Sequence, residues 1–191
     1  MKKTLTVVIA LVLVVVMSVA GTVAYLTSQV TVTNAFTVGN VTITMDEAKV
    51  DVYGVKDGDT RVTTNTYRLI PGHTYIKDPV VHVDADSENC WLFVKVENGI
   101  SDLEATGTTT IAAQLAANGW TPISEGSNIY AYSRIATKAD TNVPVFGSFT
   151  IAGNATLPAN GTGLDVVVTA YAIQADSFGT AAQAWAAAGL S

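Results

Sequence analysis

Apolar and polar residues alternate near the start of the chain and predict a β-strand between residues 26 and 38. Threonine or glutamine holds most odd positions, and the apolar residues fall at even positions: Leu26, Val30, Val32, Phe36 and Val38. After Gly39 the phase changes, because Val41, Ile43 and Met45 hold odd positions. Since a shift of one residue sends side chains to the opposite face of a sheet, residues 26–38 are predicted to be an element separate from the strand that follows.

The rest of the chain reads mainly as β-strands. Seven further segments are rich in β-branched or aromatic residues and are bounded by Gly, Pro, Asp or Asn, which is typical of strands. They span residues 49–54, 64–70, 74–85, 90–98, 127–135, 143–151 and 163–176. The "KDGDT" stretch at residues 56–60 is expected to be a hairpin turn, since it lacks the downstream glutamate of a full calcium loop.

Two short helices are predicted among these strands. In residues 108–119 Ile111 and Leu115 are spaced by four, a threonine can cap the start and Gly119 can end the helix. The alanine-rich residues 179–190 suggest a second short helix around Trp185. Because strands do not alternate with long helices, a parallel sheet is excluded, and the pattern predicts an all-β, jelly-roll-like antiparallel β-sandwich with one or two short helices.

The N-terminus has the three parts of a secretory signal peptide. A short basic start, Met1-Lys2-Lys3, precedes the apolar run from Val7 to Met17, and small residues follow. We expect cleavage between Ala24 and Tyr25, which gives a signal peptide (1–24), an N-terminal arm (25–36) and a β-sandwich domain (37–191). A retained membrane anchor is the alternative, since residues 5–24 come close to the length of a membrane span.

Composition restricts the partners and the source of stability. The 191 residues carry a net charge of −6 and no basic run beyond the first lysines, so binding to nucleic acid or to anionic lipid is not expected, and the membrane is expected to matter only for the precursor. A single cysteine, Cys90, excludes an internal disulfide framework even in an exported chain. Stability is therefore expected to come from packing, with Cys90 as a small buried side chain.

The sequence contains few groups suited to catalysis. Its two histidines are His73 and His82, and the HExxH zinc pattern and glycine-rich phosphate loops are absent. His82 and Asp84 stand two apart on a predicted strand, and the weak candidates for a calcium site are Asp84, Asp86 and Glu88. A solvated loop is the default interpretation of these acids. We predict no catalytic residues, no cofactor and no enzymatic activity.

Several stretches together resemble the TasA and camelysin family, which are secreted proteins of Gram-positive bacteria processed by the signal peptidase SipW. They are spread over most of the chain: "AGTVAYLTS", "NAFTVGNVTI", "YRLIPGHTYIKDPVVHV", "CWLFVKVEN", "VTAYAIQAD" and "AAQAW". The resemblance implies a jelly-roll-like sandwich, a SipW-type peptidase as export partner, and a secreted fibre subunit in the extracellular matrix or on the cell surface.

In fibres of that family the mature N-terminus of one subunit enters the sheet of the next. Carried onto this chain, the resemblance makes residues 25–36 the donor strand, with Leu26, Val30, Val32 and Phe36 entering pockets of the next copy of this chain or of a related subunit. Burial of four side chains offsets only part of the backbone entropy lost by ordering such an arm. We therefore expect the interface to include surface beyond the arm.

Three other interpretations stay open. The arm can fold back as the first strand of its own sandwich and leave a monomer, since alternation does not name the partner chain. The camelysin branch is described as metallopeptidases, although this sequence departs from recognised zinc motifs. The third interpretation is a monomeric surface adhesin that uses aromatic residues, with Trp120, Tyr130 and Tyr132 as candidates, although cross-strand packing is the more ordinary role for them.

Overall fold

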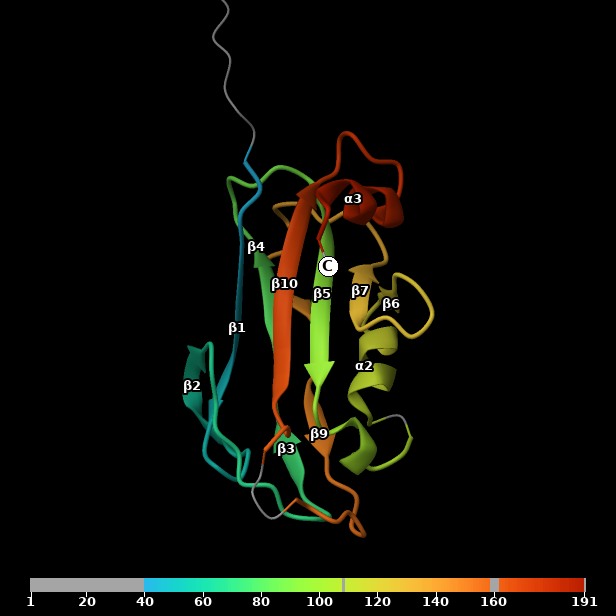
Figure 1. The fold of residues 1–191 in the computed structure, drawn as a ribbon. Helices are drawn as coiled ribbons and strands as arrows, with labels where there is room; N and C mark the ends of the chain where they lie inside the picture. The colour runs from blue at the N-terminus through green and yellow to red at the C-terminus, as the bar shows by residue number, and fades with distance from the viewer. Residues whose placement is uncertain (1–39, 108, 159–161, 191) are drawn as a thin grey trace, which may run out of the picture. The chain divides into compact units, whose positions relative to one another are not determined.

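Two four-stranded antiparallel sheets supply the main core of the protein (Figure 1). The first sheet has the strand order β2 (Lys56–Val62), β1 (Ile43–Val50), β4 (Val80–Val83) and β8 (Val143–Pro144). The second has the order β10 (Val166–Gln174), β5 (Cys90–Asn98), β7 (Ile129–Tyr132) and β6 (Trp120–Pro122). A two-stranded sheet joins β3 (Thr74–Ile76) to β9 (Ser148–Thr150). The predicted antiparallel all-β sandwich is confirmed.

This computed structural model describes residues 40–107, 109–158 and 162–190, which belong to the unit Gly39–Ser191. The predicted cleavage site at Ala24 and Tyr25 and the donor residues Leu26, Val30, Val32 and Phe36 lie outside the described residues. No helix in the described ranges is long and apolar enough to span a membrane.

Strand β5 lies at the centre of the molecule because both of its faces are apolar. Its residues Leu92 and Val94 point into the core between the sheets, whereas Phe93 packs on the opposite face against Trp185 of helix α3 (Ala181–Ala188). The Phe93 and Trp185 rings lie 4.9 Å apart. Helix α3 therefore covers the outer face of the second sheet and gives the fold a second, smaller core (Figure 1).

Both predicted helices are present, with the expected ends. Helix α2 (Ile111–Ala117) begins after Thr110, whose hydroxyl accepts from the Ala113 N–H, and Gly119 follows its last turn with a φ of 84°. Thr180 caps helix α3 in the same way, through the Gln183 N–H. A short 3₁₀ turn, η1 (Ser101–Leu103), precedes α2.

Three local predictions within residues 49–70 are wrong. Residues 51–54 form a turn and not a strand, because the Asp51 carboxylate accepts hydrogen bonds from the Tyr53 and Val55 N–H groups and closes the chain on itself. Residues 56–60, expected to turn, belong to strand β2. Residues 64–70 form no strand, since the extended chain there bonds through side chains and single backbone contacts and not through a ladder.

Candidate functional site at the open edge of the sandwich

The main core is unevenly covered. Inward residues of β4 and β5 are fully buried. Val81 on β4 and Val94 on β5, for example, have no exposed surface. The inward residues of β1 and β10 are only partly buried, although they pack against the same core: Ile43 and Met45 on β1, and Val166, Val168, Ala170 and Ala172 on β10. The sandwich is therefore open to solvent along the side where β1 and β10 run.

Strand β10 is the edge of the second sheet. All of its nine residues pair with β5, in a register that runs from Val166 opposite Asn98 to Gln174 opposite Cys90. In the described part of the chain no strand pairs with its other side. An unpaired edge of this length presents a row of backbone N–H and C=O groups that can bind a further strand.

A cleft of about 880 Å³ lies beside this edge. Residues 45–47 of β1 and 164–168 at the start of β10 line it, together with the extended residues 63–67. Apolar side chains from other segments complete the lining: Leu69, Pro79, Phe149, Leu157 and Pro158. The cleft thus combines apolar lining with free backbone groups of β10, which are the two features that an added strand needs.

A buried ion pair forms part of the polar lining of the cleft. Glu47 is 4% exposed, and its carboxylate accepts hydrogen bonds from the Lys77 ammonium at 2.7 Å and the Asn65 amide at 2.9 Å. Asn65 also donates to the Ala48 carbonyl and accepts from the Val50 N–H, so it fastens residues 63–67 to β1. Burial, together with the charges of Glu47 and Asp78, raises the pKa of Tyr67, which remains a protonated donor to the Ile76 carbonyl.

A second polar cluster joins β1, β2 and β4 next to the cleft. The Arg61 guanidinium donates to the Asp46 carboxylate and contacts Asp78 at 3.5 Å, and the His82 imidazole lies 3.1 Å from Asp46. Partial burial raises the pKa of Asp46, but the hydrogen bonds from Arg61 and His82 outweigh it and leave that pKa below its usual value. This cluster fixes the positions of three strands and leaves no free nucleophile.

The predicted metal candidates do not form a site. The Asp84 carboxylate accepts from the Asp86 N–H within the loop between β4 and β5, and Glu88 bonds through its backbone to Asn40. His82 points to Asp46 and not to Asp84. In the described ranges no group of three or more His, Cys, Asp or Glu side chains is arranged to hold a metal ion.

The predicted packing residues are placed as expected. Cys90 is fully buried, and burial, with a contribution from the nearby charge of Asp140, raises the pKa of its thiol to about 11. Trp120 is buried as well, and its indole N–H donates to the Pro144 carbonyl. Since Tyr132 packs against Trp120, two of the three aromatic candidates for an adhesive face are committed to the fold.

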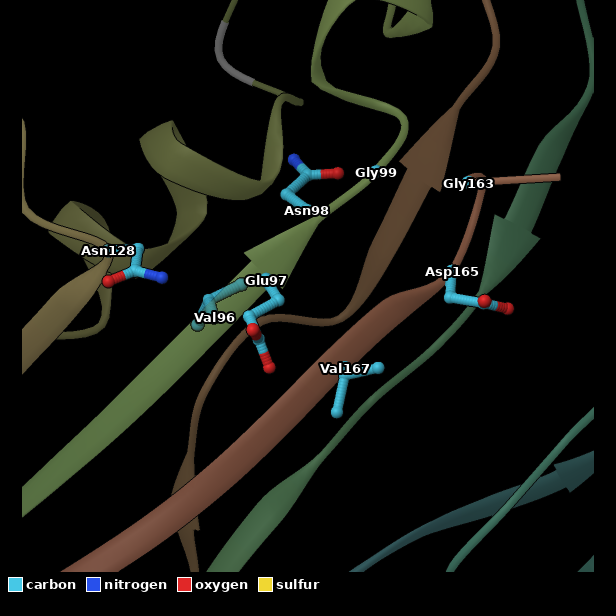
Figure 2. A pocket seen from close by; sticks show the side chains of 8 residues that line it. All are labelled: Val96, Glu97, Asn98, Gly99, Asn128, Gly163, Asp165 and Val167. Atoms are coloured by element: carbon cyan, nitrogen blue, oxygen red, sulfur yellow. The ribbon is translucent and has the colours of Figure 1, made fainter. Parts of the chain in front are cut away.

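A second, shallow hollow of about 420 Å³ lies where β5 ends and β10 begins. It includes Glu97 and Asp165, but Figure 2 shows their carboxylates pointing in different directions. Val167, opposite Glu97 in the register, adds an exposed apolar side chain. The arrangement offers no pair of groups aimed at a common atom, so the cleft beside β10 is the stronger candidate.

No protein-family model, curated protein or solved structure matches this chain. The resemblance to the TasA and camelysin family therefore stays a prediction, and the candidate site rests on the residues described above.

Proposed function

We propose that this protein is a secreted structural subunit of an extracellular fibre in a matrix or on a cell surface. In this proposal residues 25–36 of one copy lie along β10 of the next copy and fill its cleft. The observation that carries the proposal is the free edge of β10 beside partly buried inward residues of both β1 and β10. A donor strand would cover both at once.

The length of the arm suits this role. Fully extended, residues 25–36 span about 40 Å, whereas the nine residues of β10 span about 30 Å. The arm can therefore follow the whole free edge. Its four apolar residues are spaced so that they fall on one face of an extended strand, which matches an acceptor that is apolar on one side.

The direction of the donor strand follows from the two ends of the sandwich. The described chain begins at Asn40, beside residues 87 and 88, whereas the cleft lies toward the other end of β1, at residues 45–47. A contact between opposite ends of two copies does not close, so it gives a filament. An arm entering from the cleft end runs antiparallel to β10 and brings Phe36 to the part of the cleft that Val166 and Leu157 line.

Two substitutions in the arm test the proposal. In the mature chain beginning at Tyr25, Val30→Lys with Val32→Lys places two charges against the partly buried inward side of β10, because in an antiparallel pairing with Phe36 near Val166 these residues lie beside the middle of that strand. We therefore expect filaments to be lost in electron microscopy. Thr31→Lys is the matched control, because it adds a charge on the opposite face of the strand, and it should still give filaments. A chain that starts after Phe36 should stay dispersed and folded.

Several outcomes would reject or redirect the proposal. Dispersed, folded particles from the unaltered mature chain under all conditions would reject the homopolymer and favour a monomeric adhesin or a different partner. If Val30→Lys with Val32→Lys lowers the unfolding temperature of a monomer, the arm completes its own sandwich. N-terminal sequencing of protein recovered from the culture medium should begin at Tyr25, and retention of residues 1–24 would favour the membrane-anchored alternative.

A further inference from the structure

Exposed apolar side chains gather at one end of the sandwich. Seven large apolar residues are clearly exposed in the described chain, and four of them belong to the turn between β1 and β2 or to the segment that packs against it: Val52, Tyr53, Val55 and Ile70. The exposed Arg68 lies in the same segment and makes no ion pair with any described residue. These five residues are called the end patch below.

Backbone contacts hold the end patch in one shape. The Arg68 N–H donates to the Val52 carbonyl at 2.7 Å, and the His73 ring lies 2.9 Å from the Tyr53 carbonyl oxygen. Gly54 has a φ of 74°, and its carbonyl accepts from the Ile76 N–H. The exposed apolar surface is thus a built feature of the fold and not a frayed loop.

The end patch and the cleft are adjacent along the chain at residues 68–70. Leu69 lines the cleft, and its neighbours Arg68 and Ile70 belong to the end patch. A strand entering the cleft from this end passes over the boundary between the two surfaces. The residues that follow the donor strand in the donor copy must then lie close to the end patch of the copy that receives the strand.

We infer that the end patch binds a second copy of this chain, at the end of its sandwich that carries Asn40. This inference rests on the proposed function. Only residues 37–39 connect the donor strand to Asn40, and from Phe36 to Asn40 the chain reaches at most about 14 Å. So short a connection forces the two folded bodies into contact, and the end patch is the apolar surface that lies there.

Arg68 can pair with acidic side chains at the end that carries Asn40. The exposed Asp51 and Lys56 beside the end patch carry opposite charges and offset each other. Asn40 accepts a hydrogen bond from the Glu88 N–H, and the loop that contains Glu88 also exposes Asp84 and Asp86. Lys138 in the neighbouring loop offsets part of this negative charge. An acidic loop meeting Arg68 favours this pairing over the two contacts between like ends. Two Asn40 ends would place acidic loops together, and two end patches would place two Arg68 side chains together.

The test measures the critical concentration for filament formation by the mature chain beginning at Tyr25. Val55→Ser with Ile70→Ser should raise it roughly tenfold or more, since both side chains lose their apolar contact. Leu190→Ser is the control, because Leu190 is 39% exposed, much like Ile70, but lies outside the end patch. Arg68→Glu should also raise the critical concentration, and Asp86→Lys with Glu88→Lys in the same chain should restore assembly.

The outcomes separate this inference from the proposed function. If the Val55 and Ile70 variant assembles like the unaltered chain while Val30→Lys with Val32→Lys does not, the end patch has no role in assembly and the inference is overturned alone. If the Val30 and Val32 variant also assembles normally, the donor strand is wrong and both ideas fail. If Asp86→Lys with Glu88→Lys does not restore filament formation to the Arg68→Glu chain, the proposed contact between these two ends is overturned.

Discussion

Glu47 is the residue that ties the cleft to the rest of the fold. Glu47 lies on β1. Its cationic partner, Lys77, lies in the segment after β3, and its amide partner, Asn65, lies in the extended chain after β2. A buried ion pair is costly to break, because removal of one partner leaves the other charge without compensation. The structure of the cleft therefore depends on the Glu47 carboxylate, whose role cannot be predicted from the alternation of apolar and polar residues.

The substitution Glu47→Ala should lower the free energy of unfolding by about 3–5 kcal/mol, because Lys77 would stay largely buried without a counterion. Urea denaturation followed by tryptophan fluorescence measures it. The matched control is Asp57→Ala, which removes the exposed partner of Lys49 and should cost less than about 1 kcal/mol. Equal losses from the two substitutions would contradict this account.

Asp140 gives the protein an acid-dependent part of its stability. Hydrogen bonds from Arg134, which outweigh partial burial, and from the Thr137 N–H lower its pKa from 3.8 to about 2. Because the folded pKa lies below the unfolded one, this stabilisation is full above about pH 4 and is lost as the pH falls toward 2.

We expect Asp140→Asn to cost about 1–2 kcal/mol at pH 7, a value reduced for the solvent exposure of Arg134. The difference in unfolding free energy between the unaltered chain and the variant should shrink when both are measured between pH 5 and pH 2.5. A difference that stays constant over this range would show that the Asp140 charge contributes nothing.

At the scale of elements, sequence patterns predicted well the strands whose partners and faces are regular. Residues 90–98 are apolar enough to be buried on both faces, and the structure has a strand over the same span. Residues 74–85 and 143–151, each predicted as one strand, are divided between two sheets, as β3 and β4 and as β8 and β9. The larger errors concern residues 49–70, where hydrogen bonds to the Asp51 and Asn65 side chains replace ladder bonds. Alternation predicts an extended chain but does not say whether a neighbouring strand exists.

The turn between β1 and β2 offers a sharp test at this scale. Gly54 and Gly58 both have positive φ, but a Cβ at Gly54 would lie 2.7 Å from the Tyr75 Cα, whereas a Cβ at Gly58 meets nothing within 4 Å. Gly58→Ala should cost about 1 kcal/mol from backbone strain alone. Gly54→Ala should cost clearly more in thermal unfolding, and equal costs would show that the turn moves freely.

At the scale of the whole molecule, the sequence predicted a separate N-terminal strand but neither the free edge of β10 nor the cleft beside it. The cleft arises because β1 and β10, more than a hundred residues apart in sequence, lie next to each other without ladder bonds. No local pattern encodes that gap. The partial burial of the inward residues of β10, which indicates the open side of the sandwich, can be seen only in the folded structure.

Hydrogen exchange on the assembled protein tests this picture directly. Alternate amides of β10 face its free edge, so they should exchange quickly in the monomer and become protected in filaments. Amides of β5, paired on both sides, should change little. If β10 is equally protected in both forms, its edge is already occupied in the monomer.

The burial of Cys90 has a consequence for the chemical reactivity of the folded protein. A thiol with a raised pKa and no access to solvent hardly forms a thiolate, so oxidants and alkylating reagents do not reach a reactive thiol while the sandwich is intact. The same thiol becomes reactive as soon as a molecule unfolds. Intermolecular disulfides or alkylated Cys90 in an aged sample would therefore record past unfolding, and the native population would stay unmarked.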